Sequence, residues 1–140
     1  MSRMEEMKKT VEEGLPEEMF TDLRGYECGP GWVPLIRTFY LGVFDLFDLA
    51  IRAEQLKGGA FRMVQVKEKF GFLRMYYDMK EVAEREASAI HALDRFAERL
   101  SGQMCEECGA PGDRNGPGYW IRTLCPVHRE ANNARLLQGT

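Results

Sequence analysis

The last third of the chain contains a pattern of cysteine and histidine residues that is typical of metal ligands. Cys105 and Cys108 form a C-x2-C pair, and a spacer of 16 residues leads to the C-x2-H pair Cys125 and His128. Two ligands separated by two residues can hold one metal ion from a tight turn, and a second pair completes a tetrahedron. A disulfide is the alternative for such cysteines, but one member of this set is a histidine. The sequence therefore predicts one structural zinc ion bound by Cys105, Cys108, Cys125 and His128.

A complete set of four protein ligands leaves no position for a reactive water, so we expect the zinc to be structural rather than catalytic. Glu106 and Glu107 lie within the first ligand pair, and we expect both to point outward. HNH-type nucleases use a similar zinc module but also need a histidine that activates water. The strand expected before Cys125 has the sequence Tyr-Trp-Ile-Arg-Thr-Leu, without a histidine. This absence argues against the nuclease class.

Cys28 and His91 are the remaining cysteine and histidine of the chain. A nucleophilic cysteine needs a base beside it and an electropositive setting. His91 falls on a different expected helix from the Cys28 loop, and nothing in the sequence brings the two together. We favour a packing role for Cys28. An enzyme that depends on Cys28 therefore ranks last among the functions considered.

A second set of polar residues suggests a ligand-binding site. Cations on one side of a hairpin, with an aromatic ring beside them, could hold a phosphate-bearing ligand. A Gly-Pro-Gly-Trp loop precedes a helix, where free N–H groups favour anions. The alternatives are a solvated charged face for the hairpin and a packing role for the tryptophan. The residues expected at this site are Trp32, Lys67, Lys69, Arg74 and Tyr76.

The charge of the chain limits the class of ligand. The 140 residues have a net charge of −3, yet residues 57–77 contain five basic side chains against one acidic side chain. An acidic protein with a local basic patch suits a small phosphate-bearing ligand, such as a nucleotide signal, or an acidic surface of a host protein. A nucleic-acid-binding accessory role is the alternative, but the arginines of the zinc module are balanced by four acidic residues. Those arginines are Arg114, Arg122, Arg129 and Arg135.

Two features bear on the compartment. Three of the four cysteines lie in a metal pattern, which indicates a reducing compartment. The N-terminus lacks the apolar segment of a signal peptide, and the apolar run of residues 33–53 is interrupted by charged residues. We therefore expect a cytoplasmic protein that does not span a membrane, and we expect binding rather than catalysis.

The residue patterns predict an α+β fold with a long helix, a β-hairpin and a second helix packed together. The long helix should cover about residues 33–57 and bury Phe44 and Phe47. Alternation over 61–78 predicts the hairpin, with Val64, Val66, Leu73, Met75 and Tyr77 on its apolar face. Asp78 and Glu81 form a capping signature for a helix that ends near residue 100.

The chain should divide into three segments. Residues 1–25 are expected as a short helical, mobile segment, residues 26–102 as the α+β core, and residues 103–140 as the zinc module. In that module we expect a knuckle, a loop over 109–118, a strand over 119–124 and a helix over 130–137. This order is similar to a treble-clef arrangement.

Three separated motifs together resemble a family. The motifs are Cys28-Gly-Pro-Gly-Trp32, Lys67-Glu-Lys-Phe-Gly-Phe-Leu-Arg74, and the two ligand pairs with their flanks, Cys-x2-Cys-Gly-Ala-Pro-Gly and Thr-Leu-Cys-x2-His. Over residues 26–130 they resemble a family of small uncharacterised zinc-binding proteins of phages and prophages. Phe72 replaces a residue that is more often small or polar in that family. The resemblance implies a bacterial host cell and a role in phage–host conflict, and it brings no settled activity.

Overall fold

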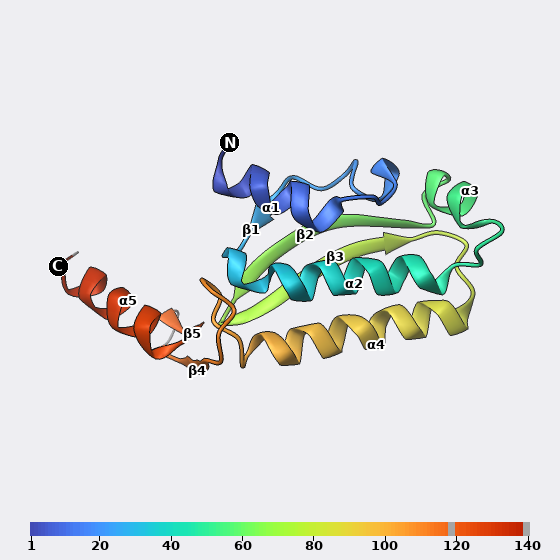
Figure 1. The fold of residues 1–140 in the computed structure, drawn as a ribbon. Helices are drawn as coiled ribbons and strands as arrows, with labels where there is room; N and C mark the ends of the chain where they lie inside the picture. Colours follow the sequence, from blue (N-terminus) through green and yellow to red (C-terminus); the bar gives the residue numbers. More distant parts are fainter. Residues whose placement is uncertain (118–119, 139–140) are drawn as a thin grey trace.

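The computed structural model describes residues 1–117 and 120–138. A three-stranded sheet forms the middle of the molecule, with helices along it and a smaller module at one end (Figure 1). The sheet and its helices share one hydrophobic core, and a second small cluster of buried residues consists of Cys105, Leu124 and Cys125. The fold is therefore mixed α and β, as predicted.

The helix expected over residues 33–57 is two helices. α2 covers Val33–Leu46 and α3 covers Arg52–Lys57. Between them, the Asp48 side chain accepts a hydrogen bond from the N–H of Ala50, the geometry of an Asx turn. Phe47 is buried as predicted, but Phe44 is only partly buried and lies under the guanidinium of Arg52, whose Cζ is 4.3 Å from the ring centre. The prediction of a single long helix was therefore wrong.

The predicted hairpin is present as β2 (Phe61–Lys69) and β3 (Phe72–Met79), and β1 (Tyr26–Glu27) pairs in parallel with β2. A register shift between Met63 and Gln65 changes the side-chain alternation of β2. Met63 is therefore fully buried, whereas Val64 is only partly buried, and the placement of Val64 on the apolar face was wrong. Val66, Leu73 and Met75 face the core as predicted.

The second long helix, α4, covers Glu84–Ser101 and lies beside α2 along the sheet (Figure 1). The capping prediction was wrong, because Asp78 belongs to β3 and Glu81 has a φ of 54°, so α4 begins only after Ala83. Near the other end of α4, the hydroxyl of Ser101 accepts the N–H of Leu73, which satisfies a backbone donor of the edge strand β3.

The N-terminal segment joins the core instead of standing apart from it. α1 (Arg3–Glu12) buries Met7 and Val11, and the short 3-10 helix η1 (Glu17–Met19) buries Met19. The Arg37 guanidinium on α2 donates to the backbone oxygens of Val11 and Glu13, which holds the end of α1.

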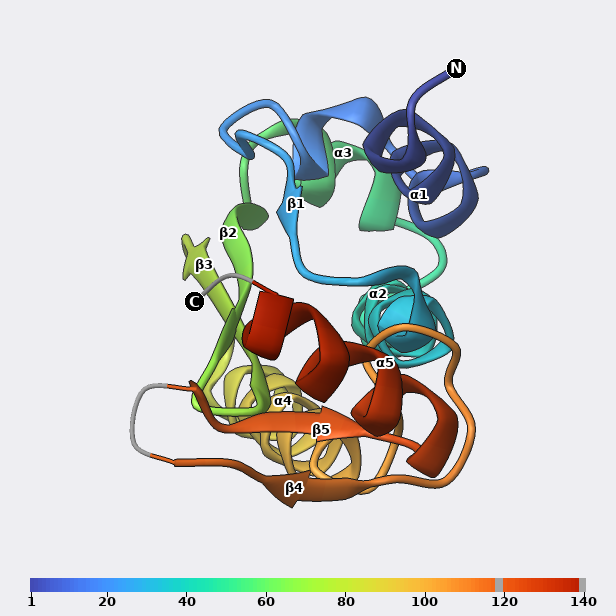
Figure 2. The same cartoon turned by 90° about the vertical axis from the view of Figure 1, so that its left-hand side faces the viewer.

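The C-terminal module contains a hairpin and a helix. β4 (Asp113–Asn115) pairs with β5 (Arg122–Leu124), and α5 (Pro126–Gln138) follows. The loop predicted over 109–118 therefore contains a strand, and the helix begins four residues earlier than predicted. Tyr119, at the start of the predicted strand, lies outside the described residues. Figure 2 shows α5 lying across the hairpin of β4 and β5.

Candidate metal centre

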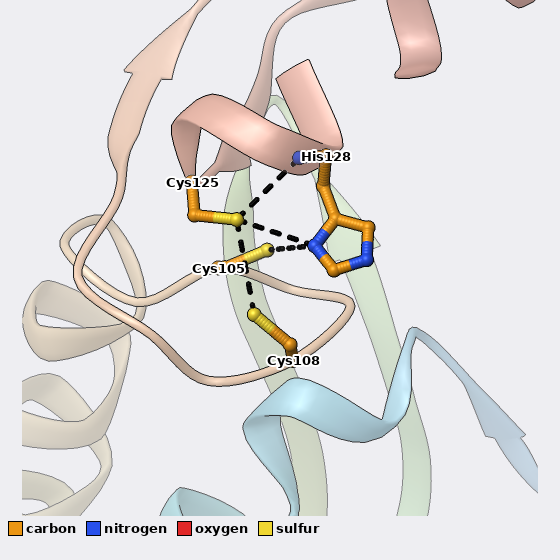
Figure 3. Close-up of side chains that lie close together, drawn as sticks. All are labelled: Cys105, Cys108, Cys125 and His128. Carbon is orange, nitrogen blue, oxygen red and sulfur yellow. Dashed lines mark hydrogen bonds between the residues drawn. The ribbon is translucent and has the colours of Figure 1, made fainter. Parts of the chain in front are cut away.

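The four predicted metal ligands converge at one point. The Sγ atoms of Cys105, Cys108 and Cys125 and a ring nitrogen of His128 all lie within 4.8 Å of one another (Figure 3). The first pair comes from the turn after α4, Cys125 immediately precedes α5, and His128 lies in the first turn of α5. Three sulfur atoms and one imidazole nitrogen in this arrangement could hold a metal ion.

Local backbone geometry explains why these side chains meet. The N–H of Cys105 donates to Ala110 O at 2.7 Å, and the N–H of Gly109 donates to Cys105 O at 2.8 Å, which closes the knuckle. Gly109 has a φ of 80°, a conformation that side chains rarely adopt. In the second pair, Pro126 occupies the first position of α5, where a missing N–H costs nothing.

The electrostatics of Cys125 favour its metal-binding form. The backbone N–H of His128 donates to Cys125 Sγ at 3.5 Å. This donor, helped by the side chains of His128, Cys105 and Cys108, lowers the pKa of Cys125 from 9.0 to about 6. The thiolate is the form of cysteine that binds metals, so Cys125 is prepared for this role at neutral pH.

Glu106 attaches the knuckle to the core and does not point outward as predicted. Its side chain is buried, and the carboxylate accepts the Gly29 N–H at 2.8 Å and the Arg122 guanidinium at 2.9 Å. Its backbone oxygen accepts the N–H of Gly31 at 2.7 Å. The loop predicted to face an external anion therefore binds a carboxylate of its own chain.

The glycine-rich loop before α2 fits closely against the knuckle. A Cβ atom on Gly31 would overlap the carbonyl oxygen of Cys105 and lie 2.6 Å from the nitrogen of Gly109. Trp32 is fully buried, and its indole N–H donates to Met104 O at 2.9 Å. Trp32 therefore anchors the core to the knuckle and is not available to a ligand.

The turn between β2 and β3 contacts the other side of the module. The hydroxyl of Thr123 donates to Gly71 O at 2.6 Å, and Arg114 Nε donates to Phe70 O at 2.6 Å. The Arg114 guanidinium also lies over the Phe72 ring, with Cζ 4.4 Å from the ring centre. The three motifs singled out in the sequence therefore meet where the core contacts the metal module.

The structure places the other predicted ligand-binding residues on the hairpin. Lys67 and Arg74 are direct cross-strand partners, as the parity of the strands predicted. Lys67 Nζ lies 5.5 Å from the ring centre of the exposed Tyr76, and Lys69 Nζ lies 5.8 Å from that of Phe70. Arg74 pairs with Glu98 of α4 at 2.9 Å. Among the described residues, neither lysine forms an ion pair.

The arginines considered for nucleic acid are engaged within the module. Arg129 donates to the backbone oxygens of Asp113, Asn115 and Arg122, and Arg135 donates to the side chain of Asn132. Burial alone would lower the pKa of Arg122, but its ion pairs with Glu106 and Glu107 outweigh this effect and raise it. Arginines with these intramolecular partners are poorly placed to bind phosphates.

Cys28 and His91 do not meet in the contacts of the described residues. Burial and the negative charge of Glu106 raise the pKa of Cys28 from 9.0 to about 12, so its thiol is protonated at neutral pH. His91 instead forms a hydrogen bond of 3.0 Å with the hydroxyl of Tyr77, which donates to Asp94. This geometry provides no activated thiol.

Comparisons with protein-family models, with proteins of curated function and with solved structures found no match. Across the described residues, no helix is both long enough and apolar enough to cross a bilayer.

Proposed function

We propose that Cys105, Cys108, Cys125 and His128 bind one structural zinc ion in a treble-clef module. Two of the distances between ligand atoms fit a tetrahedral zinc site. With Zn–S bonds of about 2.3 Å, tetrahedral ligands are about 3.8 Å apart for two sulfur atoms and about 3.5 Å apart for sulfur and nitrogen. Cys108 Sγ and Cys125 Sγ are 3.8 Å apart, and Cys105 Sγ is 3.5 Å from His128 Nδ1. Zinc bound here would supply folding free energy to a module with few buried side chains of its own.

The zinc proposal is tested by elemental analysis of the purified protein. We expect one zinc per chain in the wild type and loss of zinc in Cys108→Ser. Cys28→Ser is the matched control, because this cysteine is not a ligand, and it should retain the metal. Zinc-free wild-type protein with the module still folded would contradict the proposal.

We further propose that the protein is a non-enzymatic binding protein, a phage or prophage accessory factor that takes a small phosphate-bearing ligand on the exposed face of the hairpin. The observation that supports this is the Lys67 ammonium, which lies beside Tyr76 and forms no ion pair among the described residues. The strand partners of Lys67 are Arg74 on β3 and Glu27 on β1. A phosphate could bind between Lys67 and Arg74 while a base stacks on Tyr76. Lys69 would add charge at the turn.

The acidity of the whole chain supports a small anion over a long polyanion, because the net charge of −3 repels extended nucleic acid. Arg74 would have to share its charge between the ligand and Glu98. Lys67 therefore provides the sharper test.

Binding is measured by calorimetric titration of the zinc-loaded protein with ADP and with inorganic pyrophosphate. We expect Lys67→Ala to weaken binding by about 1–3 kcal/mol, the scale of a lost charge-assisted contact. Lys57→Ala removes an exposed lysine at the end of α3 and is the matched control. Equal affinities of the two variants, or no binding at millimolar concentration, would contradict this ligand class, whereas binding of an acidic protein alone would favour the host-protein alternative.

A further inference from the structure

The side chain of Arg74 leaves the face of the sheet that its position on β3 assigns to it. Leu73 and Met75 on either side are buried in the core. Because side chains alternate along a strand, Arg74 belongs on the outer face with the exposed Tyr76. Its guanidinium nevertheless pairs with Glu98 of α4 at 2.9 Å, and α4 packs against the core. Since β3 is an edge strand, the side chain reaches Glu98 around that edge.

The charge opposite Arg74 explains this path. Lys67 is its direct cross-strand partner on β2, where Cβ atoms are about 5 Å apart and like charges repel each other. The acid beside Lys67 on β1, Glu27, accepts a hydrogen bond from Gln65 at 3.4 Å. An anion between Lys67 and Arg74 would relieve the repulsion of the two cations. In the free protein, Glu98 relieves it by drawing the guanidinium away.

The pair of Arg74 with Glu98 is weak enough for a ligand to displace it. The two side chains are 40% and 27% exposed, and ion pairs of this exposure contribute little free energy. Nε of Arg74 is buried and has no hydrogen-bond partner among the described residues, which is unfavourable for a donor. A move of the guanidinium to the outer face would give Nε a phosphate oxygen or water as acceptor.

We propose that Glu98 competes with the ligand for Arg74. Its carboxylate holds the guanidinium at the edge of β3 in the free protein, and a phosphate-bearing ligand at Lys67 takes the guanidinium over. This inference rests on the anion site proposed above, and it gives Glu98 the role of limiting the affinity of that site. A ligand must break the ion pair before it gains Arg74, so the free energy of the pair is subtracted from that of binding.

Calorimetric titration of the zinc-loaded protein with inorganic pyrophosphate tests the proposal. We expect Glu98→Gln to bind pyrophosphate about two- to fivefold more tightly than the wild type, the range that corresponds to an exposed ion pair. Thermal unfolding shows whether the variant is folded. We expect its midpoint to stay within a few degrees of the wild type, because an ion pair of this exposure adds little to stability.

Two controls separate competition for Arg74 from a general effect of charge. Glu84→Gln removes the same charge from an exposed position of α4, 14 residues or about 21 Å along the helix, beyond the reach of screened charges in physiological salt. It should bind like the wild type. The second control makes the Glu98→Gln change in an Arg74→Ala background, where no guanidinium is left to release. The gain in affinity should disappear there.

The outcomes distinguish this proposal from the anion site on which it rests. Equal affinities of wild type and Glu98→Gln would overturn the role of Glu98 and leave the site in place. An equal gain in the Arg74→Ala background would overturn it too, because the effect would then come from the charge of Glu98 alone. Pyrophosphate that binds to neither the wild type nor Glu98→Gln would contradict the anion site itself, and this inference with it.

Discussion

The carboxylate of Glu106 accepts a hydrogen bond from the backbone N–H of Gly29 at 2.8 Å, which joins two segments 77 residues apart. The same carboxylate accepts the guanidinium of Arg122 at 2.9 Å. One buried acid therefore connects the loop before α2, the knuckle and the strand β5. The C-terminal module is therefore attached to the core by the Glu106 carboxylate and its hydrogen-bond partners, in addition to apolar contacts.

Replacing Glu106 with Ala should cost about 3 kcal/mol of unfolding free energy, because it leaves a partly buried cation and a buried N–H without their acceptor. Glu107→Ala is the matched control. Glu107 also pairs with Arg122 and with Arg3, but its side chain is 25% exposed, so the expected loss is below about 1 kcal/mol. Urea unfolding of the two variants measures the difference, and equal losses would show that Glu106 has no special role in attaching the module.

Gly31→Ala should destabilise the protein and weaken metal binding together. The added methyl group would meet the backbone of Cys105 and Gly109 in the knuckle, and backbone atoms cannot move aside without displacing the ligands. Gly58→Ala is the control, since its methyl group would have a nearest contact of 3.3 Å at the end of α3. Competition with a chelator measures the zinc affinity of both variants. Unchanged affinity in Gly31→Ala would mean that the loop and the knuckle are independent.

Residue spacing was enough to predict the Cys/His cluster that could hold a metal ion, and the paired strands. The ligand pairs are local in sequence, and two short pairs can only converge in a few ways. The cross-strand pairing of Lys67 with Arg74 followed from the alternation of side chains along the two strands and from the tight turn between them. The predicted alternation of side chains was wrong at Val64, where the register of β2 against β3 shifts. A single sequence gives no reliable signal for such a shift.

The sequence did not reveal the interface between the module and the core. A glutamate in a knuckle is usually exposed to solvent. Glu106 is buried because it contacts Gly29 and Arg122, which are distant from it in the sequence. Gly29 and Gly31 suggested a turn that binds an anion. The turn does bind an anion, but this anion is the Glu106 carboxylate of the same chain. The glycines that flank Pro30 were the available signal, because two glycines before a helix indicate close approach of another backbone.

Removing the metal should change the environment of Trp32. Its indole N–H donates to Met104 O, one residue before the first ligand, so a loosened knuckle withdraws the acceptor and admits water. Trp120 is 63% exposed and would mask the signal, so the measurement uses Trp120→Phe, which leaves Trp32 as the single tryptophan. We expect the emission to shift to longer wavelength with chelator and to return with zinc. A Trp32 emission maximum that is the same with and without metal would contradict coupling between the knuckle and the core.

Cys28 should be unreactive in the native protein. Burial and the nearby Glu106 carboxylate raise its pKa to about 12, so almost no thiolate is present at neutral pH. Native protein treated with iodoacetamide at pH 7.5 should remain unmodified at Cys28, whereas unfolded protein should react fully, as peptide mass spectrometry will show.

The same pKa difference gives Cys28 a defined effect on stability against pH. The folded protein holds the Cys28 proton more tightly than the unfolded chain, in which the pKa is near 9.0. This group therefore favours folding at any pH below 9 and loses that contribution as the pH rises from 9.0 toward about 12. Cys28→Ser should lose less stability than the wild type over this range, and urea unfolding from pH 8 to 10.5 compares the two slopes. Rapid alkylation of the native thiol, or identical slopes, would show that Cys28 is an accessible thiol with an ordinary pKa.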